Sequence, residues 1–383
     1  MTDLPAGFSV YVANMGVKDE SDDVMILVAP ETATVAGVFT KSRFSGPSVV
    51  LSRENVADGR AEAVVIVSKN ANVATGPEGE SNAREVVDLV AAGVGCRPGD
   101  VLIASTGVIG VQYPMDRVRD HLGTVRAPFA SNSADAAATA IMTTDTHAKV
   151  ASAVVGAGSV VGFAKGVGMI EPDMATMLAV ITTDAEIAPT DLDAMFRRVV
   201  ARTFNALSVD TDTSTSDSAI MFASGSAGPV DLSVLEAAVY DVALDLTRQL
   251  AFDGEGAETL IVVNVEGARD DAQAKRVAKA IVNSPLVKTA VHGADPNWGR
   301  VAMAIGKCSD ETDIEQEQVV IRFGDAEVYP AQVGTAELVA LEQYLDGDEV
   351  HIGVDLAIAN GSFSVYGCDL TDGYVRINAD YTT

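Results

Sequence analysis

Short runs of apolar, β-branched residues bounded by turn residues fill the first quarter of the chain, a pattern typical of strands. The predicted strands cover residues 8–13, 25–29, 34–39, 64–67 and 101–104. Residues 259–265 form one more predicted strand, and residues 319–378 have a similar character. We therefore expect strand-rich regions at both ends of the chain.

Apolar residues at helical spacing occupy the intervening segments. One such run follows Ser81 and ends near Gly93 and Gly95, and a short one follows Ser133. Further predicted helix starts are Thr190, the pair Ser233 and Glu236, Asp270, and Ser284 followed by Pro285. Long helices beside strands of both parallel and hairpin type predict an α+β protein with packed sheets covered by helices.

An apolar stretch at residues 151–170 carries one charge, on Lys165. Its five glycines and its Val-rich, Leu-free composition favour buried strands over a membrane helix. Glycine-rich apolar strands suit places where another backbone or a ligand comes close. We expect no membrane association.

The chain has 383 residues, which suggests two or three domains or one large α/β unit at roughly 150 residues per domain. Its net charge of −28 disfavours binding to nucleic acid or to an anionic membrane. Three cysteines, none in CxxC spacing, do not form a disulfide framework or a zinc motif. The first residues lack a basic segment leading into an apolar run, so we expect no secretory signal and a cytoplasmic protein.

Several common catalytic and binding motifs are absent from the sequence. The four histidines form no HExxH pair, and there is neither a GxSxG elbow nor a phosphate-binding P-loop. Gly156, Gly158 and Gly162 miss the dinucleotide-binding spacing by one residue. Residues 210–217 carry acidic and hydroxyl side chains but lack the Gly and Glu of a calcium loop. We therefore expect no metal ion and no cofactor.

One segment, KGVGMIEPDMATML at residues 165–178, carries candidate chemistry. Its glycines and Pro172 define an unusual backbone path, and the small Ala175 precedes the hydroxyl of Thr176. These features suit an N→O acyl shift that cuts the chain before Thr176, whose new α-amine could serve as base for its own hydroxyl. From the residues alone, a glycine-rich turn leading into a buried strand is the alternative.

This segment resembles the self-cleavage motif of the ornithine acetyltransferase (glutamate N-acetyltransferase) family. The resemblance extends along nearly the whole chain, with matching order and spacing. Further segments that carry it are SKNANVATG (68–76), ASTGVIG (104–110), IMTTDT (141–146), DTDTSTSD (210–217), DGEGA (253–257), NSPLVKTA (283–290), DPNWGR (295–300) and YVRINADYTT (374–383).

The resemblance implies an N-terminal-nucleophile-like fold. Cleavage between Ala175 and Thr176 would give an α chain of residues 1–175 and a β chain of residues 176–383. The two would fold together as one catalytic unit, with a smaller subdomain in the C-terminal part, and assemble as an α2β2 heterotetramer. The implied reaction moves acetyl from N-acetylornithine to glutamate by a ping-pong route through acetylated Thr176.

Site residues follow from the same match, position by position. The match implies that Thr176 is the nucleophile and that Thr106 with Gly107 forms the oxyanion hole. The implied substrate-binding residues are Thr143 or Thr144, Lys165, Thr176, Glu255, Asn378 and Thr383. Lys165 suits a carboxylate and Glu255 an ornithine ammonium. Without the resemblance, each has an ordinary structural explanation, such as a strand-end turn at Thr106 or a loop carboxylate at Glu255.

Some positions depart from the family pattern. Lys69 stands where Gly is common, Ala74 where Cys is frequent, and Ala294 where Asn is frequent. Val167 and Glu171 are also less usual in the cleavage motif. These details are similar to the paralogue of clavulanic-acid-type biosynthetic clusters rather than to the housekeeping arginine enzyme.

Two other functions remain open at this point. The first is an aminopeptidase or amide hydrolase of the same self-processing type, in which water replaces the amino acid as acyl acceptor. The second is a non-catalytic protein that never cleaves itself. Use of acetyl-CoA as an additional donor is also undecided.

Overall fold

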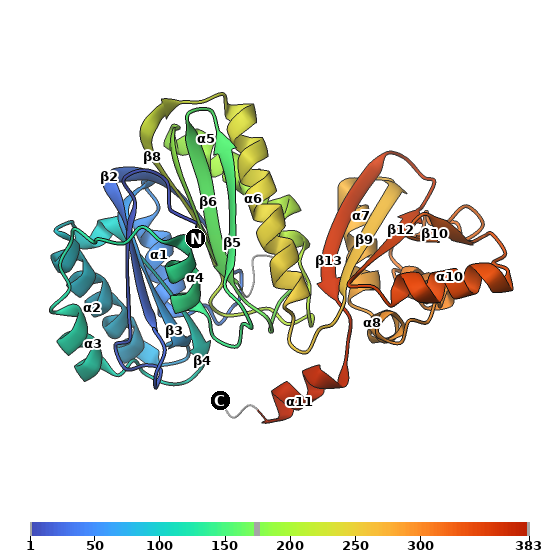
Figure 1. Cartoon of the computed structure of the whole chain (residues 1–383), viewed down its shortest axis with the longest axis horizontal. Helices are drawn as coiled ribbons and strands as arrows, with labels where there is room; N and C mark the ends of the chain where they lie inside the picture. Colours follow the sequence, from blue (N-terminus) through green and yellow to red (C-terminus); the bar gives the residue numbers. More distant parts are fainter. Residues whose placement is uncertain (1, 172–176, 381–383) are drawn as a thin grey trace.

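The computed structural model describes residues 2–171 and 177–380 (Figure 1). Ala175, Thr176 and Thr383 lie outside these residues. The strands are β1 (Ser9–Ala13), β2 (Val24–Phe39), β3 (Arg60–Asn70), β4 (Val101–Val108), β5 (Lys149–Val155), β6 (Gly158–Lys165), β7 (Leu178–Glu186), β8 (Ser218–Pro229), β9 (Leu260–Ala268), β10 (Val320–Phe323), β11 (Ala326–Tyr329), β12 (Glu349–Asp355) and β13 (Gly361–Cys368). The helices are α1 (Pro47–Asn55), α2 (Gly76–Val94), α3 (Met115–Leu122), α4 (Ala134–Ile141), α5 (Pro189–Arg202), α6 (Leu232–Phe252), α7 (Asp271–Val282), α8 (Pro285–His292), α9 (Trp298–Gly306), α10 (Thr335–Leu345) and α11 (Asp372–Asp380).

An eight-stranded mixed sheet organises the first lobe, in the order β4-β3-β2-β8-β7-β6-β5, with β1 beside β2. The β3–β4 and β7–β8 pairs are parallel, and the other pairs are antiparallel. The long strand β2 joins the two halves of the sheet. Its first part pairs with β1 and β3, its register shifts between Val28 and Ala33, and residues 34–39 pair with β8.

The two halves of this sheet face each other across a shared core. Leu27 and Ile66 from one half meet Phe163, Val180 and Phe222 from the other in a single hydrophobic cluster. Helices α2 and α3 pack on the outer face of the first half, and α5 and α6 pack on the outer face of the second. Figure 1 shows α2 and α3 outside one half of the sheet and α6 outside the other, with α4 lying against the core between the halves. The predicted α+β class with packed sheets covered by helices is confirmed.

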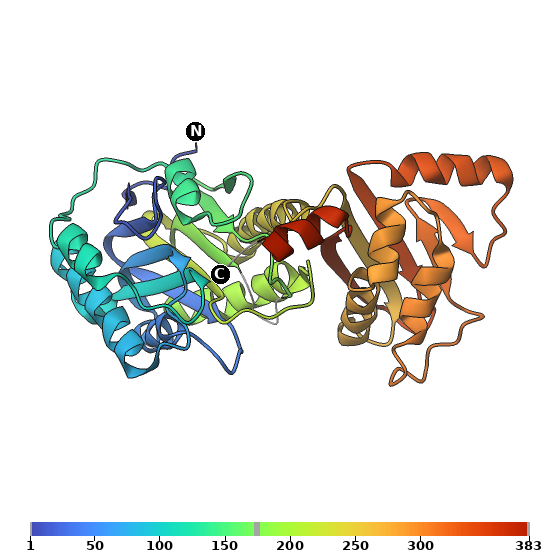
Figure 2. The same ribbon diagram turned by 90° about the horizontal axis from the view of Figure 1, so that it is seen from below.

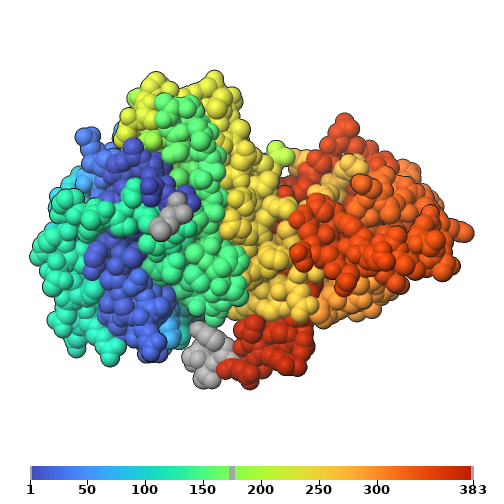
Figure 3. Space-filling model, viewed as in Figure 1, coloured from blue at the N-terminus to red at the C-terminus, as the bar shows by residue number. Residues whose placement is uncertain are grey.

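A second lobe is built on a five-stranded sheet in the order β11-β10-β12-β9-β13. Helices α7 to α10 contribute to its core. Leu260, Val262 and Tyr366 from this sheet pack into the core of the first lobe, and Leu207 bridges to Tyr366, which joins the lobes. Helix α11 leaves the second lobe and runs back toward the first along the junction, as Figures 1, 2 and 3 show from different sides.

Three predicted helix starts are confirmed by their capping hydrogen bonds. The side chains of Ser133, Asp270 and Ser284 accept hydrogen bonds from backbone N–H groups of the first turn. In each case a polar side chain satisfies a donor that the helix itself leaves free. The apolar stretch before Lys165 forms strands, as predicted, although β5 is only partly buried, and β5 and β6 pair as a hairpin.

Other predicted starts are wrong. Helix α5 begins at Pro189, one residue before Thr190, because proline suits the first helical position. Helix α6 is capped by Asp231, whose carboxylate accepts from the N–H groups of Ser233 and Val234, so Ser233 lies inside the helix. Glu236 pairs with Arg198 and does not form a capping box.

Element lengths are less predictable. The runs at 25–29 and 34–39 belong to the single strand β2, and α2 begins at Gly76, well before Ser81. The strand-rich prediction for the tail is incomplete, because α10 and α11 lie within it. None of the helices in residues 2–171 and 177–380 is long and apolar enough to cross a bilayer.

Candidate active site

Lys165 ends β6 inside the first lobe, where its side chain is buried and donates a hydrogen bond to the Thr143 hydroxyl at 3.0 Å. Burial lowers the pKa of Lys165, while the carboxylate of Asp145 opposes that shift. Thr143 follows α4 by two residues, so the end of a helix and the end of a strand meet here. This pair offers a buried amine beside a hydroxyl.

Glu255 lies beside that pair on the loop after α6. The Thr144 hydroxyl donates to Glu255 Oε1 at 3.3 Å, and the amide of Asn378 on α11 donates to Oε2 at 2.9 Å. The backbone N–H of Glu255 donates to the Val167 carbonyl at 2.8 Å. A Cβ on Gly168 would lie 2.5 Å from Oε2, so this close approach requires glycine. The first lobe and the C-terminal helix thus converge on one carboxylate.

A buried ion network holds these loops together. Lys149 is fully buried, and its ammonium donates to Asp145 Oδ1 at 2.8 Å and to Asp253 Oδ2 at 2.5 Å. Burial raises the pKa of Asp145, but the charges of Lys165 and Lys149 outweigh it, and the pKa lies below the usual value. Asp145 also accepts from the N–H groups of Thr143 and Gly166. Because Asp253 closes α6, the network ties the 143–146 loop to the 253–255 turn.

Thr106 and Gly107 lie at the end of β4, where they pair in parallel with Ser68 and Lys69 of β3. Gly107 has φ of 133°, and a Cβ there would overlap the backbone of Lys69, so only glycine fits. The Ser68 hydroxyl donates to the Ala140 carbonyl at 2.9 Å, three residues before Thr143. This contact connects the strand end to the Thr143–Thr144 segment.

Asp210 supports the chain that leads toward the undescribed residues 172–176. Its carboxylate accepts from the N–H groups of Met169 and Ile170 at 2.6 and 2.8 Å. Burial raises the pKa of Asp210, and these backbone donors oppose the shift. The N–H of Glu171 donates to the Asp212 carbonyl at 3.0 Å. The polar loop at 210–217 therefore braces this segment.

Asp217 lies at the other end of the same segment. It directly precedes β8, and its neighbour Ser218 donates through its N–H to the Met177 carbonyl at 3.1 Å. The Asp217 side chain is buried, and no described donor makes a well-formed hydrogen bond to either carboxylate oxygen. Burial raises the pKa of Asp217 well above its ordinary value, although the nearby N–H of Met177 and the charge of Lys165 oppose it.

The structure therefore brings together Thr143, Thr144, Lys165, Glu255 and Asn378, and it links Thr106 to them through Ser68. Thr143 faces the lysine and Thr144 the glutamate, so both hydroxyls belong to the cluster. Ala175, Thr176 and Thr383 lie outside the described residues.

Sequence reasoning assigned no role to Asp145, Lys149, Asp217 or Asp253. The three aspartates stand in segments that carry the family resemblance, which was an available signal. Lys149 had no signal beyond being a lone charge at the start of an apolar run.

Residues 9–383 match the model of the ArgJ family. The chain belongs to the ArgJ family. It is 60% identical to glutamate N-acetyltransferase Oat2 of Streptomyces clavuligerus, over 99% of this chain and 98% of that protein. It is 51% identical to arginine biosynthesis bifunctional protein ArgJ 2 of Nostoc sp., again over 99% of this chain and 98% of that protein.

A solved ArgJ structure, that of the arginine biosynthesis bifunctional protein of Bacillus halodurans, is 41% identical with a TM-score of 0.50. The match covers 53% of this chain and 98% of the solved chain. These ArgJ relatives confirm the predicted family and the predicted enzyme class, an acyltransferase of arginine biosynthesis. They favour it over the amide-hydrolase alternative.

Proposed function

We propose that this chain transfers an acetyl group from N-acetylornithine to glutamate through an acetyl ester on Thr176. The observation that carries the proposal is the hydrogen-bonded group of Thr143, Thr144, Lys165, Glu255 and Asn378. It holds a cationic and an anionic side chain at fixed positions beside two hydroxyls. Such an arrangement complements the carboxylate and ammonium groups of an amino-acid substrate.

Self-cleavage is the first step of the proposed mechanism. The Thr176 hydroxyl attacks the carbonyl of Ala175, the C–N bond breaks, and an ester forms between the two residues. Water then hydrolyses that ester, which leaves the carboxylate of Ala175 and the free α-amine of Thr176. An α-amine has a pKa of about 7.7–8.0, so near neutral pH it can accept the proton of its own hydroxyl.

Acetyl transfer then proceeds in two half-reactions. The Thr176 oxygen attacks the acetyl carbonyl of N-acetylornithine, and the C–N bond breaks with the hydroxyl proton passing through the α-amine to the departing ornithine amine. Glutamate attacks the resulting ester through its unprotonated amine, which restores the hydroxyl and yields N-acetylglutamate. Thr106 and Gly107 would stabilise the oxyanion in both steps, and losing one such donor typically costs ~2.7–4 kcal/mol of barrier.

Substrate recognition would divide between the two charged residues. Lys165 suits a substrate carboxylate: burial lowers its pKa, and the nearby carboxylates, Asp145 first, oppose that shift. Glu255 suits the side-chain ammonium of ornithine. Thr144 and Asn378 fix the orientation of this carboxylate, because each donates a hydrogen bond to one of its oxygens. Because both substrates carry an α-carboxylate, we expect Lys165 to serve both half-reactions and Glu255 chiefly the ornithine half.

A two-chain product and a heterotetramer are part of the proposal. The solved Bacillus halodurans chain is matched almost completely and yet covers about half of this chain, which supports a protein made of two pieces. Helix α11 contributes no buried residue and leaves Val375 and Ile377 exposed, which is consistent with a surface that an α2β2 assembly covers.

We also propose a cytoplasmic location. Cys96, Cys308 and Cys368 are all free thiols, as expected in a reducing compartment. The similarity to Oat2 of Streptomyces clavuligerus, at 60% identity against 42% for ArgJ 2 of the same organism, supports the clavulanic-acid-type branch.

Intact mass spectrometry before and after addition of N-acetylornithine tests the proposal. We expect two chains that separate before Thr176 and an added acetyl group on the larger one. The Thr176→Ala variant should remain a single unmodified chain. Thr190→Ala, on the exposed first turn of α5, is the matched control and should behave like the parent protein.

Acceptor dependence separates the transferase from the hydrolase. With N-acetylornithine and glutamate, N-acetylglutamate should accumulate. If acetate forms at the same rate with and without glutamate and no N-acetylglutamate appears, the hydrolase is the correct function. A single, unmodified parent chain would contradict both.

A further inference from the structure

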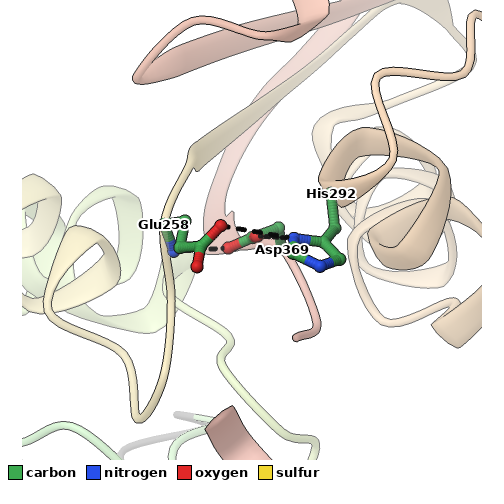
Figure 4. A group of neighbouring side chains, drawn as sticks. All are labelled: Glu258, His292 and Asp369. Carbon is green, nitrogen blue, oxygen red and sulfur yellow. Dashed lines mark hydrogen bonds and ion pairs between the residues drawn. The ribbon is translucent and has the colours of Figure 1, made fainter. Parts of the chain in front are cut away.

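Three residues that the proposed mechanism does not use meet at the junction between the lobes. Glu258 precedes β9, His292 ends α8, and Asp369 follows β13. His292 Nδ1 lies 3.5 Å from Glu258 Oε2 and 3.3 Å from Asp369 Oδ2. Each of the three side chains offers one possible metal ligand atom, and these atoms all lie within 4.8 Å of one another. No other group of three or more His, Cys, Asp or Glu side chains within residues 2–171 and 177–380 meets that condition. Figure 4 shows the three side chains directed toward a common point.

These separations are longer than hydrogen bonds but suit a shared metal ion. An N–H···O hydrogen bond usually spans about 2.7–3.2 Å. Two ligand atoms bound at about 2.0–2.2 Å to one tetrahedral ion lie roughly 3.4 Å apart. Both separations from His292 Nδ1, 3.5 and 3.3 Å, agree with the spacing of two ligand atoms on a tetrahedral ion.

Asp369 provides an independent indication of a ligand. Its side chain is fully buried, and its Oδ1 accepts from the N–H groups of Glu258 and Thr259 at 2.9 and 3.1 Å. Its Oδ2 is buried and accepts no hydrogen bond from any described donor. The backbone thus orients this carboxylate through Oδ1 and directs Oδ2, which has no hydrogen bond from a described donor, toward His292, as the outer contacts of a metal site do.

We propose that Glu258, His292 and Asp369 bind one divalent transition-metal ion of the zinc type, with water at the fourth position. Imidazole nitrogen and carboxylate oxygen are ligands that Zn²⁺ accepts readily. An imidazolium would satisfy the site less well, since its single Nδ1 hydrogen can donate well to only one of the two carboxylates. One ion binds all three groups together.

Such an ion would fasten three segments near the candidate active site. Asp369 also lines a cavity of about 180 Å³ together with Glu255 and Tyr374. Glu258 follows Glu255 by three residues, and Asp369 precedes the helix that carries Asn378. The metal would therefore stabilise the segment that follows Glu255 and the segment that precedes α11. This inference stands whether or not acetyl transfer is the reaction.

Metal titration of the full, chelator-treated chain is the test. Equilibrium dialysis against ZnCl₂ should give one ion per chain and a raised thermal unfolding midpoint. His292→Asn and Asp369→Asn should each weaken the affinity at least ~100-fold and abolish the thermal shift. His351→Asn is the matched control, because His351 in the same lobe pairs with a single carboxylate among the described residues, Glu349, at 2.7 Å. It should bind zinc like the parent chain.

Cobalt provides a readout that remains informative if a variant is less stable. Co²⁺ bound tetrahedrally should give intense visible absorption in the parent chain and in His351→Asn, and none in His292→Asn. Equal uptake and equal spectra in the parent and His292→Asn would overturn the proposal. So would the absence of any stoichiometric uptake in the parent, and His292 would then serve only as an ion-pair partner.

Discussion

Buried ionisable side chains are the main residue-scale feature of this molecule. Lys149, Lys165 and Asp217 are nearly or completely removed from solvent. Burying a charge without partners is costly, so such groups either pair or change their protonation. Lys149 pairs with two carboxylates, whereas Asp217 has no well-formed hydrogen bond from any described donor. Asp217 is therefore the group expected to change its protonation rather than to pair.

Replacing Asp217 should change how stability depends on pH. Its folded pKa is raised by burial, while an unfolded Asp has a pKa of about 3.9. The Asp217 carboxyl therefore ionises at a lower pH in the unfolded chain than in the folded one. As a result, the parent loses stability as pH rises through the folded pKa. Asp217→Asn removes this loss. The thermal unfolding midpoint of the variant should therefore rise relative to that of the parent as the pH increases from 5 to 8.

The exposed Asp212→Asn in the same loop is the control and should show no such trend. A constant difference for Asp217→Asn across this range would contradict the assignment. Because the N–H of Met177 lies beside Asp217 and is one peptide bond from residue 176, the same variant should also cleave itself more slowly. Chain separation on a denaturing gel measures that rate.

Three of the five residues that depart from the family pattern share one backbone property. Lys69, Ala74 and Ala294 have φ of 72°, 57° and 49°. Gly and Asn adopt this left-handed region more easily than Lys or Ala. The sequence indicated that these positions are unusual, but only the backbone shows why Gly or Asn would suit Lys69 and Ala294.

Ala294→Gly should therefore stabilise the second lobe. A left-handed residue costs about 1–2 kcal/mol, and the greater freedom of Gly in the unfolded chain offsets about 0.4–1 kcal/mol of the gain. We expect a net increase of roughly 0.5–1 kcal/mol in the free energy of unfolding, measured by urea denaturation. Ala302→Gly inside α9 should instead destabilise by about 1 kcal/mol. Equal effects would contradict the explanation.

At the scale of elements, the candidate site is made from ends of helices and strands. Thr143 follows α4, Lys165 ends β6 and Glu255 follows α6. The motifs identified these segments in the sequence. They did not identify Lys149, because its partners Asp145 and Asp253 are 4 and 104 residues away and only the fold brings them together.

Lys149→Met should show how much this network contributes. The change preserves the length of the side chain but leaves two buried carboxylates without their cation. Breaking a buried pair from one side costs about 3–5 kcal/mol, so a large fall in the free energy of unfolding is expected. Urea denaturation in the uncleaved Thr176→Ala background measures it on a single chain.

Arg197→Ala provides the contrast for that measurement. Arg197 pairs with Asp193 on the exposed surface of α5 at 2.8 Å. Exposed pairs contribute about 0–1 kcal/mol, so this variant should unfold almost like its background. If Lys149→Met also costs less than about 1 kcal/mol, the network does not hold the loops.

At the scale of the whole molecule, sequence patterns predicted the class of fold. They did not predict that a single sheet bends so that its two halves face each other across a core. Periodicity shows which face of a strand is apolar. It does not show that β2 changes partners between Val28 and Ala33, because a register shift depends on neighbours distant in sequence. Helix α11 at the end of the chain was missed for a different reason, since it has no buried residue that would give a helical pattern.

The order of strands has a consequence for a chain cut before Thr176. Strands β7 and β8 follow residue 176, and they lie between β2 and β6, which precede it. Residues 34–39 pair with β8, and residues 160–165 pair with β7. Both fragments also contribute side chains to the shared core. Separating them would break two ladders of backbone hydrogen bonds and expose that core.

Cleaved protein should therefore remain a single particle under native conditions. We expect the two fragments to co-elute at equal stoichiometry on size exclusion at every concentration that can be measured, and to separate only in denaturant. The uncleaved Thr176→Ala variant should elute at the same volume, because the cut changes no pairing of strands. If fragments 1–175 and 176–383 elute apart in native buffer, the shared sheet cannot be the structure of the mature protein. Co-elution would mean that the cut frees an amine without dividing the molecule, because the inserted strands β7 and β8 hold both fragments in one sheet.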